Sequence, residues 1–379
     1  MLTKAFRLIL FYSRKYFDLF FPLIDRWLVV IYCTPSPSVR RLLTRPVFEF
    51  RRLLVLLRRG LSYKLFVFKG IAADMNVPFS VAYFADGENM DYLISLLFAD
   101  GQVERVQRGS CSLWALAKTA TMLAQEVDLV VVERNSLLKW KPSFGSWVVG
   151  PTWIKSVLDF KPGETWEQVQ TRFKKQSRYI RRFKEAGYTS VVTNRDEDFD
   201  FFYDRMHVPL IETRHKGYGS VGSKKGLYPF FKRGHIRFAL NSENQPVAGW
   251  LNWVQGDVMV AYVNGVLDAD RKWMEDRALS VLYYYLLQWC HENGMRRCDA
   301  GGARPFAHDG VYVHKLRWGF HPVQELWQIH QWLFWAPYDS PAALKWLETH
   351  PFIPEFAQVG STSLESVYQK IPSFQSSHN

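Results

Sequence analysis

ENQPVAGWLNWVQGDVMVAYVNGVLD, residues 243–268, is the stretch of sequence that decides the fold. It holds two apolar runs, PVAGWLNWV and VMVAYVNGV, which are separated by the turn sequence QGD. A third run, HIRFAL at 235–240, precedes them and is joined to them through SENQ, which is also a good turn sequence. The three runs predict a three-stranded antiparallel meander.

A helix and a further strand follow the meander. Residues 276–294, DRALSVLYYYLLQWCHENG, place apolar side chains at helical spacing and end in a glycine stop. MRRCDA at 295–300 is predicted as a short strand, and a right-handed crossover places it parallel to VMVAYVNGV. DAGGARPFAHDGVYVHKLRWGF at 299–320 then predicts a strand end, a glycine turn and a helix between Asp309 and Gly319.

The 379 residues are enough for two domains, and 48% hydrophobic against 22% charged residues indicates a globular chain. The clearest helix is ETWEQVQTRFKKQSRYIRRFKEAG at 164–187, which is basic on its outer faces. From about residue 62, the part of the chain before this helix also alternates between strand and helix patterns. Four segments are predicted there: a strand at 77–85, helices at 88–101 and 112–127, and a strand at 128–134. The fold class is therefore mixed α+β. We expect the Ser-rich tail from about residue 360 to be disordered.

The order of elements after residue 188 resembles the GNAT acyltransferase fold. The residues that carry the resemblance are FKKQSRYIRRFKEAGY, the stretch 243–268 and GMRRCDAGGARPFAHDGVYVHKLRWGF, and over 140–325 they look most like the CelD-like and Fem-type (FemAB-like) branch of that superfamily. The resemblance implies two tandem GNAT-like halves. The domains expected on this basis are a basic amphipathic helical segment at 1–60, a degenerate N-terminal half at 61–163, the acyltransferase domain at 164–340 and a C-terminal extension at 341–379.

The resemblance also implies an activity. It predicts an N- or O-acyltransferase that moves an acyl group from acyl-CoA, such as acetyl-CoA, to an amine or hydroxyl of a glycan, lipid-linked or small-molecule acceptor, as in cell-envelope or polysaccharide biosynthesis. Two alternatives stay open: a Fem-type transferase that uses aminoacyl-tRNA, and an inactive GNAT-fold interaction protein at a membrane. The body after residue 60 carries 36 Lys and Arg against 33 acidic residues, which weakens the tRNA alternative.

The stretch 299–320 supplies the candidate catalytic residues. The resemblance points to Lys315 for charge stabilisation during transfer, and helical spacing places it on one face with Val311 and Trp318. Asp299 either orients Lys315 or binds an acceptor amine, or else it forms an Asx-turn with its own backbone. The glycines Gly301 and Gly302 either present N–H groups to an anion or form a plain tight turn.

The other candidate site residues lie on the donor and acceptor sides of the implied cleft. In the superfamily, acyl-CoA lies where two parallel strands splay apart, here VMVAYVNGV and MRRCDA. Alternation along the first of these strands puts Tyr262 and Asn264 on one face, as cleft residues or as exposed polar residues. The usual glycine-rich pyrophosphate loop is absent, so phosphate binding would fall to Arg271 and Lys272. For the acceptor side the resemblance points to Arg214 and His215, whose alternative role is to cap a helix dipole (both end a predicted helix).

Basic charge is concentrated in residues 1–60, which hold 12 Lys and Arg against three acidic residues. No uncharged apolar run there reaches the roughly 18 residues that a spanning helix needs. Charged and apolar residues instead fall on different faces of a helix, so we expect this segment to lie on an anionic membrane surface. The alternative is a helix packed on its own domain or in a dimer. The first interpretation predicts a cytoplasmic protein held peripherally on the inner face of the membrane.

Cysteine and histidine spacing argues against a metal. The four cysteines are scattered, and no histidine pair has zinc-ligand spacing beside a carboxylate. We therefore expect no metal, and a reducing compartment is the simplest setting for the free thiols.

Overall fold

The computed structural model describes residues 46–47, 49–50, 53, 62–85, 89–215, 222–324, 329–338, 340–360 and 362–371. The predicted amphipathic segment at 1–60 thus lies outside the described residues, apart from a few positions. Within the described ranges, no helix combines the length and apolar character that crossing a bilayer requires. The chain divides into two compact units: unit 1 comprises Met1–Ile154, Arg304–Asp309 and Gln324–Asn379, and unit 2 comprises Lys155–Ala303 and Gly310–Val323.

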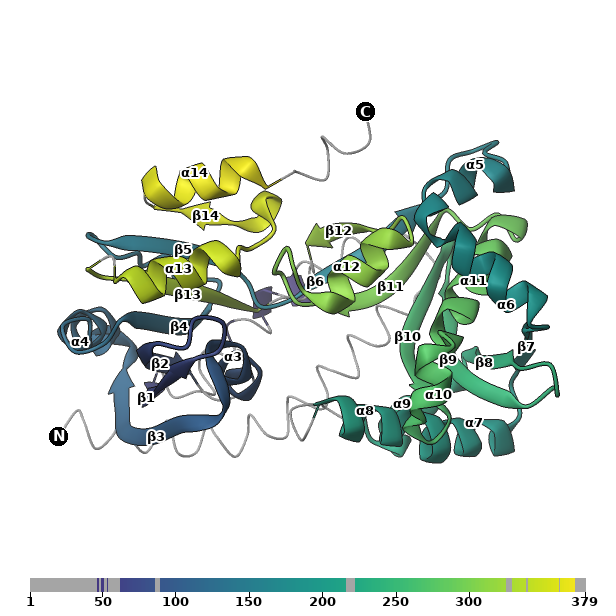
Figure 1. Ribbon diagram of the computed structural model, residues 1–379, viewed down its shortest axis with the longest axis horizontal. Helices are drawn as coiled ribbons and strands as arrows, with labels where there is room; N and C mark the ends of the chain where they lie inside the picture. The colour runs from purple at the N-terminus through teal and green to yellow at the C-terminus, as the bar shows by residue number, and fades with distance from the viewer. Residues whose placement is uncertain are drawn as a thin grey trace. The chain divides into compact units, whose positions relative to one another are not determined.

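Unit 2 is built on a seven-stranded sheet with the strand order β12-β6-β11-β10-β9-β8-β7 (Figure 1). Its strands are β6 (Ile154–Asp159), β7 (Thr189–Thr193), β8 (Gly234–Leu240), β9 (Pro246–Gln255), β10 (Val258–Val266), β11 (Arg297–Ala303) and β12 (His321–Gln324). Its helices are α5 (Trp166–Thr171), α6 (Ser177–Glu185), α7 (Asp196–Phe202), α8 (Val208–His215), α9 (Lys224–Phe231), α10 (Arg271–Glu275), α11 (Ala278–Glu292) and α12 (Gly310–Arg317). A π-helical turn, Tyr203–His207, joins α7 to α8.

The meander and the crossover that the sequence predicts are present. Strand β9 pairs antiparallel with both β8 and β10, and β10 pairs parallel with β11 after the long helix α11. One face of the sheet packs on α11 around Trp250, and the other packs on α7 and α9 around Phe202. Apolar residues cover both faces of β9, which explains why its sequence reads as a nearly continuous apolar run.

Unit 1 is built on a second seven-stranded sheet, in the order β14-β5-β13-β4-β2-β1-β3. Its strands are β1 (Ser62–Ala72), β2 (Pro78–Ala85), β3 (Phe98–Ser112), β4 (Leu129–Asn135), β5 (Ser146–Pro151), β13 (His330–Ala336) and β14 (Gln358–Val359). Its helices are α3 (Met90–Leu97), α4 (Leu116–Leu123), α13 (Pro341–Thr349) and α14 (Thr362–Lys370). The neighbouring strands β2 and β4 are parallel, whereas β1 pairs antiparallel with β2.

The two sheets share one plan. Each has an antiparallel pair, β1–β2 or β9–β10, followed by a parallel partner, β4 or β11. Each also takes in a strand from elsewhere in the chain: β13 lies between β4 and β5, and β6 lies between β11 and β12. Because β13 returns to the first sheet after the unit 2 segment, unit 1 includes residues from both the early and the late part of the chain.

The long basic helix predicted at 164–187 is broken. It consists of α5, a 3₁₀ turn at Lys174–Gln176, and α6. The break occurs at Phe173, whose backbone is not helical (φ −120°, ψ 33°) and whose buried ring lies 5.4 Å from that of Trp318. Packing of Phe173 in the core therefore overrides the helical pattern.

Two further predictions in unit 1 were wrong. The helix predicted at 88–101 ends at Leu97, because Phe98 adopts an extended conformation and packs on Phe68 and Phe79 as the first residue of β3. The tail predicted to be disordered from residue 360 contains α14. This helix is held through Tyr368, whose hydroxyl accepts a hydrogen bond from Phe352 N at 2.9 Å.

Gly265 lets the π-helical turn approach β10 closely. A Cβ added there would lie 2.4 Å from Met206 C and 2.6 Å from His207 N. We expect Gly265→Ala to lower the free energy of unfolding by about 1–3 kcal/mol, because the backbones must move apart. Gly310→Ala, where a Cβ meets nothing within 4 Å, is the matched control. Urea unfolding measures both, and equal stability of the two variants would contradict the prediction.

Candidate active site

Parallel pairing between β10 and β11 ends early, near the centre of the unit 2 sheet. The two strands pair in parallel only from Val258–Val260 to Arg297–Asp299, although β10 continues to Val266. The pairing of β10 with β9 also shifts register between Ala261 and Val263. Such an irregularity bends a strand locally. The two strands still lie close just past the third pair, because a Cβ on Gly301 would be 3.4 Å from Ala261 O. We call the unpaired stretches of β10 and β11 beyond Val260 and Asp299 the wedge.

The wall of the wedge on β11 is a glycine turn fixed by charged side chains. Gly301 has φ +76°, in the left-handed region that favours glycine. Its N–H donates to Asp299 Oδ1 at 2.8 Å, which is the Asx-turn contact. The other carboxylate oxygen, Oδ2, accepts a hydrogen bond from Lys155 Nζ at 3.0 Å. Asp299 is only 6% exposed, so its charge requires this partner.

Lys315 fixes the same turn from the side of α12. Its Nζ donates to Gly301 O at 3.1 Å and to Gly302 O at 2.7 Å, and the side chain is buried. Asp299 and Lys315 thus meet at Gly301, the first through its N–H and the second through its carbonyl. The expected helix face was partly wrong, because Val311 is 48% exposed and Tyr312 is buried beside Lys315 instead. These contacts define Lys315 as the residue that orients two successive peptides.

The wall of the wedge on β10 carries Tyr262 and Asn264. Tyr262 remains 44% exposed, and its ring lies 4.7 Å from that of Phe230 on α9. The carbonyl of Asn264 lies 2.9 Å from Nδ1 of His207. Both predicted residues therefore lie on the part of β10 that has no parallel partner in β11.

The predicted phosphate-binding residues lie on the short helix α10, between β10 and α11. Arg271 is 87% exposed at its side chain and pairs with Glu275 at 2.6 Å, and Lys272 Nζ lies 4.4 Å from the ring of Trp273. The predicted acceptor residues Arg214 and His215 end α8, and their side chains are not among the described ones. Within the described ranges, no three His, Cys, Asp or Glu side chains gather as a metal site requires.

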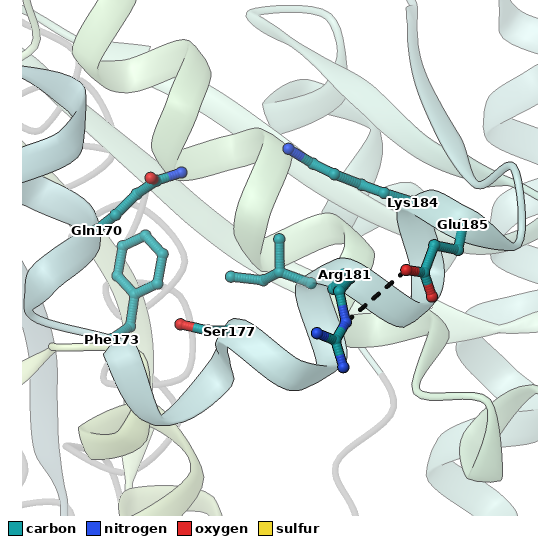
Figure 2. Close-up of a pocket in the computed structure, with 7 residues that line it drawn as sticks. Gln170, Phe173, Ser177, Arg181, Lys184 and Glu185 are labelled. Carbon is teal, nitrogen blue, oxygen red and sulfur yellow. Dashed lines mark ion pairs between the residues drawn. The ribbon is translucent and has the colours of Figure 1, made fainter.

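A separate groove of about 370 Å³ runs along α5 and α6 (Figure 2). It is lined by Gln170, Phe173, Ser177, Ile180, Arg181, Lys184 and Glu185. Arg181 pairs with Glu185 across 3.7 Å, and Lys184 Nζ donates to Tyr284 Oη at 2.8 Å. None of the lining residues belongs to β10, β11 or α12, so the groove is distinct from the wedge.

Unit 1 contains a buried polar cluster that sequence reasoning did not find. Glu133, fully buried on β4, accepts hydrogen bonds from Tyr83 Oη and Asn89 Nδ2, both at 2.8 Å. Asn89 Oδ1 in turn accepts a hydrogen bond at 2.8 Å from Arg304, whose guanidinium lies 3.8 Å from the ring of Trp153. Burial raises the pKa of Tyr83 and lowers that of Arg304 to about 10. The cluster fixes the carboxyl end of β4, an inner strand of the unit 1 sheet.

Sequence reasoning also missed Lys155 and His207. Lys155 lies on β6, which enters the unit 2 sheet from far away in the sequence, so no local pattern connects it to Asp299. His207 lies inside a helical pattern and carried no motif. The one available signal was Lys155 itself, a lysine inside the short, mainly buried strand sequence IKSVL.

We expect Lys155→Met to lower the free energy of unfolding by about 1–3 kcal/mol, because it leaves the Asp299 carboxylate buried without its cation. The double variant Lys155→Met/Asp299→Asn should be less destabilised than the two single variants predict, with a coupling of at least about 0.5 kcal/mol. Lys161→Met, an exposed lysine, is the control. Strict additivity in urea unfolding would show that the pair contributes nothing.

Comparison with known proteins gives a family for this site. Residues 170–315 match the family model described as an acetyltransferase (GNAT) domain. No curated protein matches the chain. Among solved structures, L-PGS from Bacillus licheniformis is similar at 14% identity and a TM-score of 0.32, over 83% of this chain and 96% of that one.

Two further solved structures are similar at comparable levels. FemX has 10% identity and a TM-score of 0.36, over 68% of this chain and 81% of its own. A tandem GNAT protein from the clavulanic acid biosynthesis pathway has 10% identity and a TM-score of 0.27, over 82% and 93%. These low scores establish no substrate. The family match spans the glycine turn and Lys315, and it supports the predicted GNAT superfamily for residues 170–315. The two sheets share one plan, as two GNAT-like halves would.

Proposed function

We propose that the protein transfers an acyl group from acyl-CoA to an acceptor at a membrane surface, with the donor bound in the wedge of unit 2. The observation that carries the proposal is the early end of parallel pairing between β10 and β11, after Val260 and Asp299. It leaves β10 from Tyr262 to Val266 without a parallel neighbour. An open strand edge hydrogen-bonds amide groups in an extended ligand, and the pantetheine arm of CoA carries such amides.

The glycine turn supplies the second half of the proposed donor site. Because peptide C=O and N–H groups point in opposite directions, Lys315 turns the N–H groups of Gly302 and Ala303 away from itself. Successive N–H groups that point the same way stabilise anions, including the oxyanion that forms when a thioester is attacked. Lys315 therefore acts as a positioning residue, and Asp299 holds the turn from the other side. Arg271 and Lys272 on α10 are the cations proposed for the CoA phosphates.

A second candidate function is supported by the charge of α6 and the turn before it. Lys174, Lys175, Arg178 and Arg182 are all exposed there, and such a basic face suits a polyanionic donor such as aminoacyl-tRNA. This is the Fem-type alternative. Acyl-CoA remains the first choice, because the unpaired stretch of β10 offers backbone groups to an extended thioester arm and the body of the chain is nearly neutral.

Lys315→Met tests the donor site. We expect acyl transfer from acetyl-CoA to fall by roughly 10²-fold or more, because the oxyanion donors lose their orientation. Arg317→Met, an exposed cation on the same helix, should leave transfer unchanged. Calorimetric binding of acetyl-CoA and longer acyl-CoAs tests the donor class. Failure of the wild type to bind any of them, together with salt-sensitive retention of aminoacyl-tRNA, would move the assignment to the second candidate.

The location at a membrane rests on residues 1–60 and has its own test. In the full-length chain, we expect replacement of Arg51, Arg52, Arg58 and Arg59 by Gln to reduce cosedimentation with vesicles containing anionic lipid. About 1 kcal/mol per basic residue near the surface predicts a loss of several orders of magnitude in binding at low salt. Neutral phosphatidylcholine vesicles are the control. Undiminished cosedimentation of the variant would contradict a role for this basic cluster.

A further inference from the structure

Two large apolar side chains project from the outer side of α4 and the 3₁₀ turn Leu113–Ala115 that leads into it. The buried residues of α4, which pack on the unit 1 sheet, are Leu116, Ala120 and Leu123. Trp114, in contrast, is 81% exposed, and Met122 is 61% exposed. Trp114, Lys118 and Met122 recur every four residues, which places them together on the side that faces away from the sheet.

A second segment of unit 1, residues 136–145, carries exposed apolar side chains over the same face of the sheet. Leu137 and Phe144 are each 38% exposed. Leu138 and Trp140 of this segment pack on the same apolar cluster as Leu116 of α4, whereas α3, α13 and α14 cover the opposite face of the sheet. The two segments therefore belong to one layer. Its exposed side chains, which we call the Trp114 face, are Trp114, Lys118, Met122, Leu137, Lys139, Lys141 and Phe144.

Buried groups hold the second segment in place from beneath. Trp335 Nε1 donates to Phe144 O at 2.9 Å, and the two rings meet edge to face at 5.0 Å. Arg134, which is 2% exposed on β4, donates to the carbonyl of Trp140. Leu137 N donates to Asn135 Oδ1 at 2.9 Å. Leu137 and Phe144 are thus exposed on a segment whose backbone is fixed by hydrogen bonds to the core.

Lysines are interleaved with these apolar side chains. The ranges 113–123 and 136–145 contain Lys118, Lys139 and Lys141, all exposed, and no acidic residue. Lys141 Nζ lies 4.9 Å from the ring of Trp147, as in lysines whose stem follows apolar surface while the charge stays in water. The next acidic residue along the chain is Glu126, three residues after the end of α4. The Trp114 face is therefore both apolar and positively charged.

This combination of side chains suits a lipid surface better than a protein surface. Apolar residues that are exposed singly need no explanation, but grouped ones that are rimmed by polar residues mark a site of interaction. Tryptophan is enriched at the boundary between lipid and water, and anionic headgroups attract lysines near the surface. A bilayer also receives a projecting ring without a matching pocket, whereas tryptophans that dominate protein interfaces fill pockets in the partner.

We propose that the Trp114 face docks on an anionic phospholipid bilayer. Trp114 and Met122 insert among the headgroups, and the three lysines lie beside lipid phosphates. This inference rests on the membrane location in the proposed function, and it assigns part of that location to the folded unit 1 rather than to residues 1–60 alone. A small inserted apolar area combined with a few charges gives reversible binding that depends on lipid composition.

Quenching of tryptophan fluorescence tests the insertion directly. The full-length chain is titrated with vesicles of phosphatidylglycerol and brominated phosphatidylcholine, because bromine quenches indole rings that lie close to it. We expect bromine-dependent quenching to fall in Trp114→Phe, which removes the inserted ring. Trp153→Phe is the control, since Trp153 is also exposed but stacks on Arg304 beside Trp332 of the opposite sheet face. Equal quenching in the wild type and Trp114→Phe would overturn the proposal.

Cosedimentation with phosphatidylglycerol-containing vesicles tests the apolar contribution to affinity. In the full-length chain, Trp114→Ala/Met122→Ala should weaken binding by roughly 10-fold or more, because two apolar side chains lose their burial in the interface. Val191→Ala/Val192→Ala is the matched control, since both valines are exposed on β7 in unit 2, and it should bind as the wild type does.

The lysines have a separate signature in the dependence on salt. Replacing Lys118, Lys139 and Lys141 by Gln should weaken binding to the same vesicles by roughly 10²-fold at low salt, and by much less at high salt, where the charges are screened. An equal loss at both salt concentrations would show that the lysines do not act on lipid charge.

Two further outcomes would contradict the proposal in different ways. If the wild type is a dimer without vesicles by analytical ultracentrifugation, and Trp114→Ala/Met122→Ala is a monomer, the Trp114 face joins two copies of the chain. If the wild type binds vesicles and this variant binds them equally well, the Trp114 face is the wrong surface, while the membrane location in the proposed function stands. If the wild type binds no anionic vesicles, that location is wrong, and this inference falls with it.

Discussion

The structure of unit 2 depends on the point at which β10 and β11 stop pairing. Parallel strands gain hydrogen bonds from every residue they pair, so an early end at Val260 and Asp299 has to be enforced by other contacts. On β10 it is enforced by the register shift before Val263 and by the π-helical turn packed on Gly265. On β11 it is enforced by the turn at Gly301. The same contacts that end the pairing of the two strands define the stretch of β10 at which the donor is proposed to bind.

The buried charges in this site mainly fix the geometry of the backbone around Gly301. Lys315 and Asp299 are almost fully buried, yet each directs its charge at the backbone of Gly301 as well as at other groups. Burying a charge is costly unless it is paired and hydrogen-bonded, and here the backbone and Lys155 provide the partners. A lysine whose Nζ donates to two carbonyl groups is better suited to fixing the backbone than to donating a proton. Its contribution to catalysis is therefore expected through the peptides it orients.

The sequence predicted the part of the fold in which local pattern and tertiary packing agree. The meander β8–β10, helix α11, strand β11 and the lysine helix α12 all follow from periodicity and turn residues, and so do the residues of the glycine turn. Sequence patterns did not predict the features that depend on distant chain segments. β13 joins the unit 1 sheet and β6 joins the unit 2 sheet beside strands that are far away in sequence, so no local pattern linked Lys155 to Asp299. Phe173 shows the same effect on a smaller scale, because its packing on Trp318 breaks a helix that its sequence favours.

The shared plan of the two sheets raises the question of which half binds a donor, and the contacts within each half favour unit 2. In unit 1 the parallel pair β2–β4 ends at Phe84 and Val132, and the next residue of β4 is the fully buried Glu133. Tyr83 and Asn89 occupy both oxygens of its carboxylate, and a buried network of this kind is costly to open. In unit 2 the last paired residue of β11 is Asp299, and Ala300 and then Gly301 and Gly302 follow it. A strand end closed by a satisfied carboxylate stabilises a sheet, whereas one that ends in an oriented glycine turn leaves backbone groups for a ligand, and this difference supports placing the proposed donor site in unit 2.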